Sequence, residues 1–146
     1  MNQVPIFLNG GFHQDERGIL KFVNDFDFET VKRFYLVQNE STNVVRAWQA
    51  HKYESKYFYI VSGSFTICVV KIDNWEKPSI DLPVQVFQLS DKESKILFVP
   101  CGYANGFKAN QPNSKLIIFS DKSLDLSEKD NFRFDPNLWL DWSNIS

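Results

Sequence analysis

The chain has 146 residues, of which 43% are hydrophobic and 16% aromatic, so it has enough apolar material for one folded domain with a core. Its formal net charge is -2 and no block of like charge occurs, which argues against nucleic acid or an anionic membrane as a partner. Its 2 cysteines are too few for a disulfide framework or a metal cluster, and we expect two reduced, buried thiols.

In chain order, the first segment, MNQVPIFLNG, lacks the basic region and long apolar run of a secretory signal. No later apolar run approaches the length of a membrane span, so we expect a cytoplasmic protein. Short apolar runs separated by turn residues predict strands at residues 5–8, 18–23, 31–37, 44–50, 56–61, 64–71, 84–89, 95–99 and 114–119. Residues 122–131 are expected to hold one short helical turn. This pattern predicts a single all-β domain over residues 1–146, folded as an antiparallel jelly-roll barrel.

Residues 44–64 read as two strand-like arms joined by a short charged turn, KYES, and are the place where we expect chemistry. Gln49 and His51 lie two positions apart in the first arm, so a regular strand points both side chains to one face. If that face lines the barrel, both side chains enter one cavity. His51 is then a candidate proton carrier, because imidazole titrates near neutral pH, and a structural histidine is the alternative. Glu54 falls in the turn, which we expect to be exposed.

The same arm makes a poor metal site. A His-x-His pair on a strand often begins a metal site in a barrel, because both imidazoles face inward. Here the pair is Gln49-x-His51, Lys56 lies near the usual place of a glutamate, and Asn105 lies where a later histidine is usual. An amide, a cation and one imidazole are weak ligands for zinc, iron or manganese. We therefore expect no metal.

Two arginines are candidates for binding an anion. Arg17 lies in the motif DERG and Arg46 lies two positions before Trp48. Guanidinium groups suit phosphates because they bind two oxygens at once, and ordinary surface salt bridges are the alternative. Arg46 and Gln49 are three positions apart, so a regular strand points them to opposite faces. Both reach one site only if the strand is bulged or Arg46 lies at the barrel mouth.

A series of motifs extends over nearly the whole chain: DERG at 15–18, LVQNES at 36–41, VVRAW at 44–48, WQAHK at 48–52, VSGS at 61–64, VPCGYANGF at 99–107, and FRFDP at 132–136 with DW at 141–142. In this order they resemble motifs of the RmlC-like cupin enzymes that act on dTDP-4-keto-6-deoxy sugars. These enzymes are the dTDP-4-dehydrorhamnose 3,5-epimerases and the dTDP-sugar 3,4-ketoisomerases.

The resemblance implies a cupin-type double-stranded β-helix and a nucleotide diphosphate sugar, dTDP-linked, as the ligand. Arg17, Gln38 and Arg46 match positions that contact the nucleotide diphosphate sugar, and Lys56 matches a lysine near the sugar ketone. No cofactor is implied. A homodimer is expected, because the apolar strand at 5–8 offers an edge to a partner's sheet.

The sequence departs from the resemblance at the positions that transfer protons. Gln49 occupies the place of the epimerases' catalytic histidine, and glutamine cannot act as a base. Asn105 replaces a second histidine, and Ile118 lies near the place of an acidic tyrosine. The aspartate that orients the base belongs to a C-terminal extension that this chain lacks. His51, in contrast, matches a histidine of the ketoisomerases.

Three functions are compatible with these patterns. The first is a cofactor-independent 3,4-ketoisomerase or single-centre epimerase of a dTDP-linked 4-keto-6-deoxyhexose, in deoxysugar or surface polysaccharide biosynthesis. In it, His51 carries the proton, while Lys56 with Gln49 or Asn105 stabilises the enediolate oxygen. The second is a cupin that binds a nucleotide sugar or a glycan without turning it over. The third is an interaction protein whose barrel face only dimerises.

Overall fold

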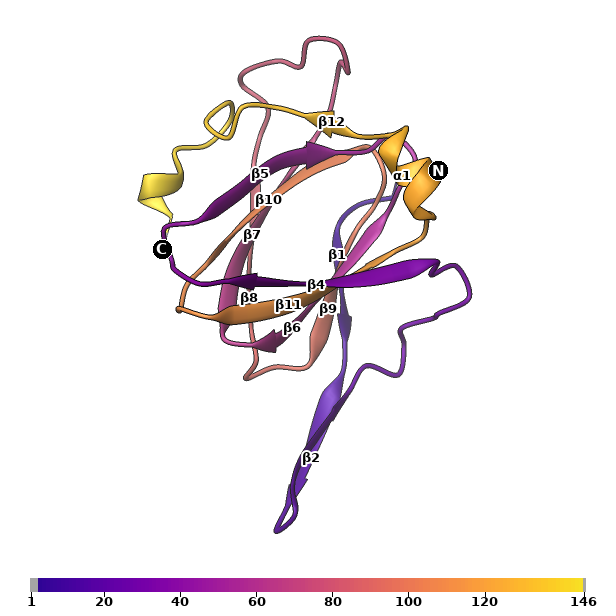
Figure 1. The fold of residues 1–146 in the computed structure, drawn as a ribbon, viewed down its shortest axis with the longest axis vertical. Coiled ribbons are helices and arrows are strands. Elements are labelled where there is room, and N and C mark those ends of the chain that lie inside the picture. Colours follow the sequence, from indigo (N-terminus) through magenta and orange to yellow (C-terminus); the bar gives the residue numbers. More distant parts are fainter. Residues whose placement is uncertain (1–2, 146) are drawn as a thin grey trace.

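The computed structural model of the protein describes residues 3–145, which are mainly antiparallel β-structure (Figure 1). The strands are β1 (Ile6–Asn9), β2 (Gly11–Asp15), β3 (Gly18–Phe22), β4 (Arg33–Asn39), β5 (Val45–Ala50), β6 (Lys56–Ser62), β7 (Ser64–Lys71), β8 (Gln85–Ser90), β9 (Lys95–Val99), β10 (Tyr103–Ala109), β11 (Ser114–Ser120) and β12 (Phe132–Arg133). A short helix, α1 (Leu124–Glu128), and a 3-10 turn, η1 (Trp142–Asn144), complete this part of the chain. Neither of these helical segments has the length and apolar character needed to cross a membrane.

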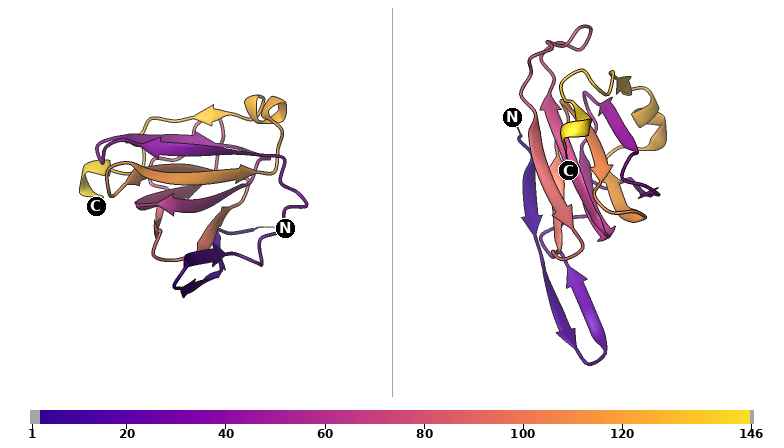
Figure 2. Two further views of the ribbon diagram at one scale, coloured as in Figure 1. Left: turned by 60° about the horizontal axis from the view of Figure 1, so that its bottom comes forward. Right: turned by 90° about the vertical axis from the view of Figure 1, so that its left-hand side faces the viewer.

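Two five-stranded sheets form the body of the molecule and pack face to face (Figure 2). Their strand orders are β1-β9-β6-β11-β4 and β12-β5-β10-β7-β8, and every pairing is antiparallel. Placing β4, β11, β6 and β9 in one sheet and β5, β10, β7 and β8 in the other is the order of a jelly roll. The predicted all-β cupin fold is confirmed, although the two sheets remain separate and do not close into one continuous barrel.

The core lies between the sheets and comes from alternate residues of their strands. In β11, Leu116 and Ile118 are buried, whereas the residues between and after them are only half-buried. These two side chains belong to one apolar cluster with Phe58 of β6 and Ile67 of β7. The period of two is the pattern that predicted these strands. Burial of each such side chain contributes about 1.5–3 kcal/mol, which holds the strands in place around the cavity described below.

The second sheet is buried on both faces, because the C-terminal segment packs over its outer side. Trp48, Cys68 and Val70 belong to a second apolar cluster that includes Trp142. The indole N–H groups of Trp48 and Trp142 both donate to the carbonyl oxygen of Pro136, at 3.1 and 2.8 Å. The nearly continuous burial along β7 follows from this two-sided packing.

The sequence patterns missed strands β2, β10 and β12. The most informative case is β10, which is the middle strand of its sheet but contains Asn105 and Gly106, a pair typical of turns. A Cβ atom at Gly106 would lie 2.6 Å from the Ala47 Cβ and 2.8 Å from the Trp142 ring. Glycine is therefore required there by the close approach of β5 and the C-terminal segment, and it does not mark a turn.

Strands β2 and β3 form a separate hairpin that projects from the body (Figure 1). Residues 11–18 resemble a turn in sequence, but only the tip between Asp15 and Gly18 is one. Gly18 has a φ of 131°, which a residue with a side chain would adopt only with strain. The hairpin exposes Phe12 and Leu20 to solvent.

The two cysteines lie in different environments. Cys68 is fully buried, and burial raises the pKa of its thiol to about 11. Cys101 is exposed in the turn before β10, so the expectation of two buried thiols was wrong for this residue. Both are free thiols, as expected from their number.

Candidate active site

A cavity of about 610 Å³ opens between the two sheets, with α1 and the segment that leads into β12 forming part of its wall. Its volume falls within the range of small-molecule sites, roughly 300–1,000 Å³. Strands of both sheets contribute to the lining: Arg33, Tyr35 and Val37 of β4, Val45, Arg46, Ala47, Trp48 and Gln49 of β5, Lys56 of β6, Asn105 and Phe107 of β10, and Ile118 of β11. The remaining lining residues are Leu124, Ser127, Glu128, Asn131 and Arg133.

Four of the predicted site residues line this cavity: Arg46, Gln49, Lys56 and Asn105. Arg46 and Gln49 share it because β5 is bulged. In the pairing of β5 with β10, Gln49 lies opposite Asn105 and Arg46 lies opposite Phe107, so three steps along β5 match two along β10. The extra residue reverses the alternation and turns both side chains to one face. The bulge that the sequence analysis required for Arg46 and Gln49 to reach one site is therefore present.

Three predicted site residues lie outside the lining. Gln38 is exposed on β4, one position out of phase with the lining residues of that strand, and its amide donates to Asn113 Oδ1 at 3.5 Å. Arg17 lies at the tip of the projecting hairpin, where its Nη2 is 2.6 Å from Asp15 Oδ2. His51 follows the end of β5 and is buried next to the cavity wall. Arg17 and Gln38 lie away from the other predicted residues, whereas His51 contacts the same buried carboxylate, Glu54, as Lys56.

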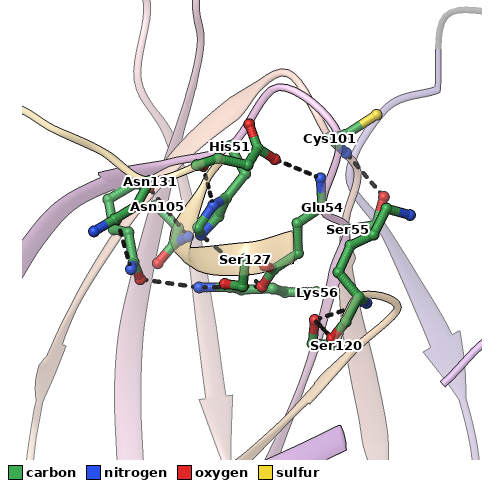
Figure 3. A network of polar contacts seen from close by, with 12 residues as sticks. His51, Glu54, Ser55, Lys56, Cys101, Asn105, Ser120, Ser127 and Asn131 are labelled. Atoms are coloured by element: carbon green, nitrogen blue, oxygen red, sulfur yellow. Dashed lines mark hydrogen bonds and ion pairs between the residues drawn. The ribbon is translucent and has the colours of Figure 1, made fainter. Parts of the chain in front are cut away.

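Neutral amides connect Lys56 to the segment that follows α1 (Figure 3). Lys56 Nζ donates to Gln49 Oε1 at 2.9 Å, and Gln49 Nε2 donates to Asn131 Oδ1 at 3.1 Å. Asn105 Nδ2 donates to the backbone carbonyl of Gln49 at 3.3 Å. Gln49 occupies the position at which the similar epimerase motif has a catalytic histidine. Its side-chain amide is held through both its oxygen and its nitrogen.

Glu54 is a buried carboxylate at the centre of a charged cluster, and the expectation that it lies in an exposed turn was wrong. Its side chain is 0% exposed, and its Oε2 lies 3.5 Å from Arg33 Nη2, 3.8 Å from Lys56 Nζ and 3.9 Å from His51 Nε2. Neither carboxylate oxygen has a hydrogen-bond partner in the described protein. A buried charge of this kind depends on its ion-pair neighbours, so Glu54 holds three cationic or titratable side chains around it.

His51 is held in one orientation by a backbone contact. Its Nδ1 lies 2.6 Å from the carbonyl oxygen of Asp130, and because a carbonyl only accepts, Nδ1 carries the proton and donates. The Nε2 atom has no hydrogen-bond partner among the described residues and faces Glu54. Burial, with a further contribution from the Lys56 charge, lowers the pKa of His51 below its ordinary value. The ring is therefore mainly neutral at physiological pH.

Lys56 is the buried cation that faces the cavity. The residue is 3% exposed. The pKa of its ammonium is lowered to about 8, chiefly by burial; Glu54 opposes this decrease, and the charges of Arg33 and Arg133 add to it. A lysine in such a place exchanges its proton near neutral pH, unlike the ordinary lysines of a protein surface.

Several residues that line the cavity were not predicted from the sequence, chiefly Arg33, Arg133 and Asn131. Arg33 Nη2 donates to Ser127 Oγ at 3.0 Å and thereby joins β4 to α1. The signal for Arg33 was present, because Arg33, Tyr35 and Val37 alternate along β4 and all line the cavity. Arg133 and Asn131 carried no such signal, since they reach the site only through the long-range pairing of β12 with β5.

The charge of the lining favours an anionic ligand. Three arginines and one lysine line the cavity, whereas its only acidic lining residue is Glu128 on α1. Arg46 is fixed from behind, since its Nε donates to Asn39 Oδ1 at 2.9 Å. Residues 3–145 contain no cluster of three or more His, Cys, Asp or Glu side chains that could hold a metal ion. Fixed guanidinium groups in a cavity of this size are suited to phosphate oxygens.

Comparison with models of known protein families shows the family to which the chain belongs. A family model described as dTDP-4-dehydrorhamnose 3,5-epimerase matches residues 6–146, nearly the whole chain. The chain belongs to this family. The resemblance seen in the sequence motifs is thereby confirmed. No curated protein sequence gives a significant match to the chain.

Solved structures with the same fold include epimerases and ketoisomerases. The rmlC epimerase of Mycobacterium tuberculosis is 22% identical, with 94% of this chain and 74% of that chain covered and a TM-score of 0.75. QdtA, a sugar 3,4-ketoisomerase from Thermoanaerobacterium thermosaccharolyticum in complex with TDP, is 19% identical, with 92% and 90% covered and a TM-score of 0.70. ChmJ, a 3'-monoepimerase from Streptomyces bikiniensis in complex with dTDP-quinovose, is 13% identical, with 97% and 76% covered and a TM-score of 0.77. At these identities the comparisons establish the fold.

In this member of the dTDP-4-dehydrorhamnose 3,5-epimerase family, the positions singled out by the sequence motifs lie in the cavity wall. Gln49 and Asn105 replace the histidines that the motifs lead one to expect, and both line the cavity. Ile118, near the expected place of an acidic tyrosine, also lines it and is apolar. Beside them lies the titratable cluster of Lys56, Glu54 and His51.

Proposed function

We propose that this protein is a 3,4-ketoisomerase or single-centre epimerase of a nucleotide-linked 4-keto-6-deoxyhexose, with a dTDP-linked sugar as the first candidate. The observation that carries the proposal is the placement of Lys56 Nζ in a cavity lined by arginines, 2.9 Å from Gln49 Oε1. Such a reaction removes the C–H proton beside a ketone and needs stabilisation of the enediolate oxygen, together with a group that moves the proton. It belongs to deoxysugar synthesis, and no cofactor is required.

The cationic lining supports a diphosphate in the ligand. Arg46 and Arg133 come from adjacent strands of one sheet and Arg33 from the opposite sheet, so the guanidinium groups surround the cavity from two sides. We assign Arg46 and Arg133 to the diphosphate, since guanidinium groups bind two phosphate oxygens at once. The relatives QdtA and ChmJ were crystallised with TDP and dTDP-quinovose, which makes a dTDP-linked sugar the first ligand to test.

Fixed dipoles support stabilisation of the enediolate. Gln49 is held by Lys56 and Asn131, and Asn105 donates to the carbonyl of Gln49, so these polar groups are ordered before a substrate arrives. Preorganised donors and cations lower the energy of developing oxygen charge because they need no reorientation during the reaction. Lys56 is the cation best placed for this role.

The direct test is proton exchange. Purified protein is incubated in deuterated water with dTDP-4-keto-6-deoxyglucose, and NMR follows deuterium at C3 and C5 together with any new sugar. Deuterium at one centre, or a 3-keto product, supports the proposal. A variant with Lys77→Ala, an exposed residue outside the cavity, serves as the matched control for purification and stability. Unchanged substrate after prolonged incubation counts against this substrate and this chemistry.

A second candidate is a cupin that binds a nucleotide sugar without turning it over. The amide pair of Gln49 and Asn131 motivates it, since neither side chain titrates. Binding of dTDP by calorimetry, with no exchange into any keto-sugar, would favour this alternative. Restoring histidine by Gln49→His with Asn105→His is the sharper probe, because a site that still binds substrate should then gain exchange.

We also propose a homodimer in the cytoplasm. Phe34 and Leu36 on β4 and Phe12 and Leu20 on the hairpin are large apolar side chains exposed to solvent. An exposed apolar surface of this kind marks an interaction site, and closed two-fold dimers are the commonest assembly. Arg17 contributes to ligand binding only if the hairpin of one protomer reaches the cavity of its partner. Subcellular fractionation tests the location.

A further inference from the structure

The cavity wall offers few groups that can accept a proton. Its arginines remain charged at any physiological pH. Burial raises the pKa of Tyr35 to about 12, which makes this phenol hard to ionise. Glu128 lies on α1 and is exposed to solvent. Lys56 is the remaining titratable group of the lining, and it is buried in the wall with its Nζ directed toward the cavity amides.

His51 lies one layer further from the ligand space. It is not part of the lining, and its Nε2 faces Glu54 Oε2 at 3.9 Å, while the same oxygen lies 3.8 Å from Lys56 Nζ. Glu54 therefore lies between Lys56, which lines the cavity, and His51, which does not, and Figure 3 shows the three side chains in one network. Glu54 and Lys56 therefore provide a route by which a proton on His51 could reach the cavity.

The charges around Lys56 favour exchange of its proton. Glu54 stabilises the ammonium, whereas burial and the nearby guanidinium groups favour the neutral amine, and the pKa of Lys56 is about 8. Roughly a tenth of the molecules then carry a neutral amine at pH 7. The titratable and charged groups that face Lys56 come from every element packed against it: Arg33 and Tyr35 of β4, Glu54 and His51 of the β5–β6 loop, Arg133 of β12 and, across the cavity, Glu128 of α1.

We propose that Lys56, rather than a histidine, takes the proton from the substrate carbon, and that Glu54 and His51 form the buried pair behind it. This inference rests on the proposed function. The neutral amine removes the C3 hydrogen as a proton, the C–H electron pair becomes the C3–C4 double bond, and the ketone electrons move to O4. The hydroxyl proton on O3 then passes to O4, and the Lys56 ammonium returns its proton to C4, which yields the 3-ketone. Protonation at C3 from the opposite face by a water molecule yields the C3 epimer instead, and the Lys56 ammonium gives its proton to the resulting hydroxide, which restores the neutral amine.

The first experiment titrates Lys56 without a substrate. NMR of protein labelled with 13C and 15N at lysine follows each side chain between pH 6 and 11, and the signal lost in Lys56→Arg identifies Lys56. A midpoint near 8, well below the ordinary lysine value of about 10.4, is expected. If Lys56 instead titrates at the ordinary lysine value, the inference is overturned, whatever result the exchange experiment gives.

The second experiment measures exchange of deuterium into the keto-sugar. Lys56→Met removes the amine, and Lys56→Arg keeps the charge but cannot deprotonate, so each should lose about 100-fold or more of the exchange rate. Lys92→Met is the matched control. In a Cys101→Ser background, the thiol of Lys56→Cys is alkylated with 2-bromoethylamine, which restores a slightly less basic amine, while the buried Cys68 is spared. Recovered exchange, with the pH limb moved to lower pH, is expected.

The outcomes separate this inference from the proposed function. Exchange by the wild type that persists within about threefold in Lys56→Met and Lys56→Arg overturns the role of Lys56 and leaves the function standing. Binding of dTDP without any exchange in the wild type overturns the function and, with it, the catalytic role. Exchange that is lost in both variants and recovered by aminoethylation supports both.

Discussion

The carboxylate of Asp130 accepts the backbone N–H of Glu54 at 3.1 Å, although the two residues are 76 positions apart in the chain. The same carboxylate accepts the N–H groups of Lys52 and Tyr53, each at 2.8 Å. Three donors on one carboxylate fold the β5–β6 loop inward. Asp130 thereby places the Glu54 side chain in the interior.

Replacement of Asp130 by asparagine should destabilise the fold, because one carboxylate oxygen becomes an N–H₂ group that faces backbone donors. Loss of charged hydrogen bonds of this kind predicts a decrease in the free energy of unfolding of about 2–4 kcal/mol. Urea denaturation followed by circular dichroism measures it. Asp125→Asn, an exposed carboxylate in α1, is the control and should change stability little. A variant as stable as the wild type would show that the loop folds inward without this acceptor.

His51 should make stability depend on pH. Its pKa is lowered in the folded state, chiefly by burial, so the unfolded chain binds the proton more tightly. The resulting stability is present above the unfolded pKa of about 6.5 and decreases as pH falls from there toward the folded value. His51→Asn should flatten this decrease, whereas His13→Asn on the exposed hairpin should not. Denaturation midpoints between pH 5 and 8 provide the measurement, and identical slopes in the two variants would contradict the expectation.

Glu54→Gln should lower the pKa of Lys56 further, because it removes the one nearby charge that stabilises the ammonium. In the proposed mechanism the active form is the neutral amine, so kcat/KM rises with pH through this pKa, near 8 in the wild type. The rising limb should therefore move to lower pH in the variant. Glu76→Gln, an exposed carboxylate outside the cavity lining, is the control. A limb that stays in place or moves to higher pH would rule out the assigned coupling.

Arg46→Ala should weaken binding more than it slows chemistry. Arg46 is oriented by Asn39 and lines the cavity, and a charge-assisted contact with a phosphate contributes about 1.5–3 kcal/mol, or roughly 10–100-fold in affinity. Calorimetric titration with dTDP should show this loss, with kcat within about threefold of the wild type. Lys77→Ala supplies the control for a distant positive charge. Equal affinity in the wild type and Arg46→Ala would place the diphosphate elsewhere.

Phe34→Asp should convert a dimer into a monomer. The Phe34 side chain is 66% exposed on the outer side of β4, and a charge there should oppose burial against a second copy. Light scattering should change from twice the chain mass of 17.1 kDa to that mass alone. Val86→Asp, on β8 of the opposite sheet, should keep the dimer. A wild-type protein that is monomeric at high concentration would remove the basis for this prediction.

Most of the strands could be predicted from the sequence. Alternate residues of a strand are buried between the two sheets, so apolar residues recur at every second position. That pattern fails in β10, where Gly106 looks like a turn residue but is required by the packing of Ala47 and Trp142. The reason lies in segments remote from β10 in the chain, so no local window contains it. The middle strand β6 of the other sheet, in contrast, follows the local pattern and was predicted.

The candidate site was predictable in several residues of β5, β6 and β10, but not in Arg133 of β12 or in the β5–β6 loop. Gln49 and Asn105 were placed by alternation and by motif, and both line the cavity. Glu54 was misplaced because its neighbours are charged and turn-like, and the residue that folds it inward, Asp130, follows α1. The charged β5–β6 loop is buried because the distant Asp130 accepts its backbone N–H groups. A local sequence pattern does not show such a long-range contact.

The bulge in β5 determines which residues of that strand face the cavity. Upstream of it, the residues that face the cavity fall on one parity, and downstream they fall on the other, so Arg46 and Gln49 cooperate despite their odd spacing. Insertion or deletion of a single residue between them would move one of the two to the opposite face, whereas a change of two residues would restore the arrangement. The number of residues in this segment therefore constrains homologous chains as strongly as the identity of either side chain. A sequence alignment with a one-residue gap there would match residues that line the cavity with residues that pack beneath the C-terminal segment.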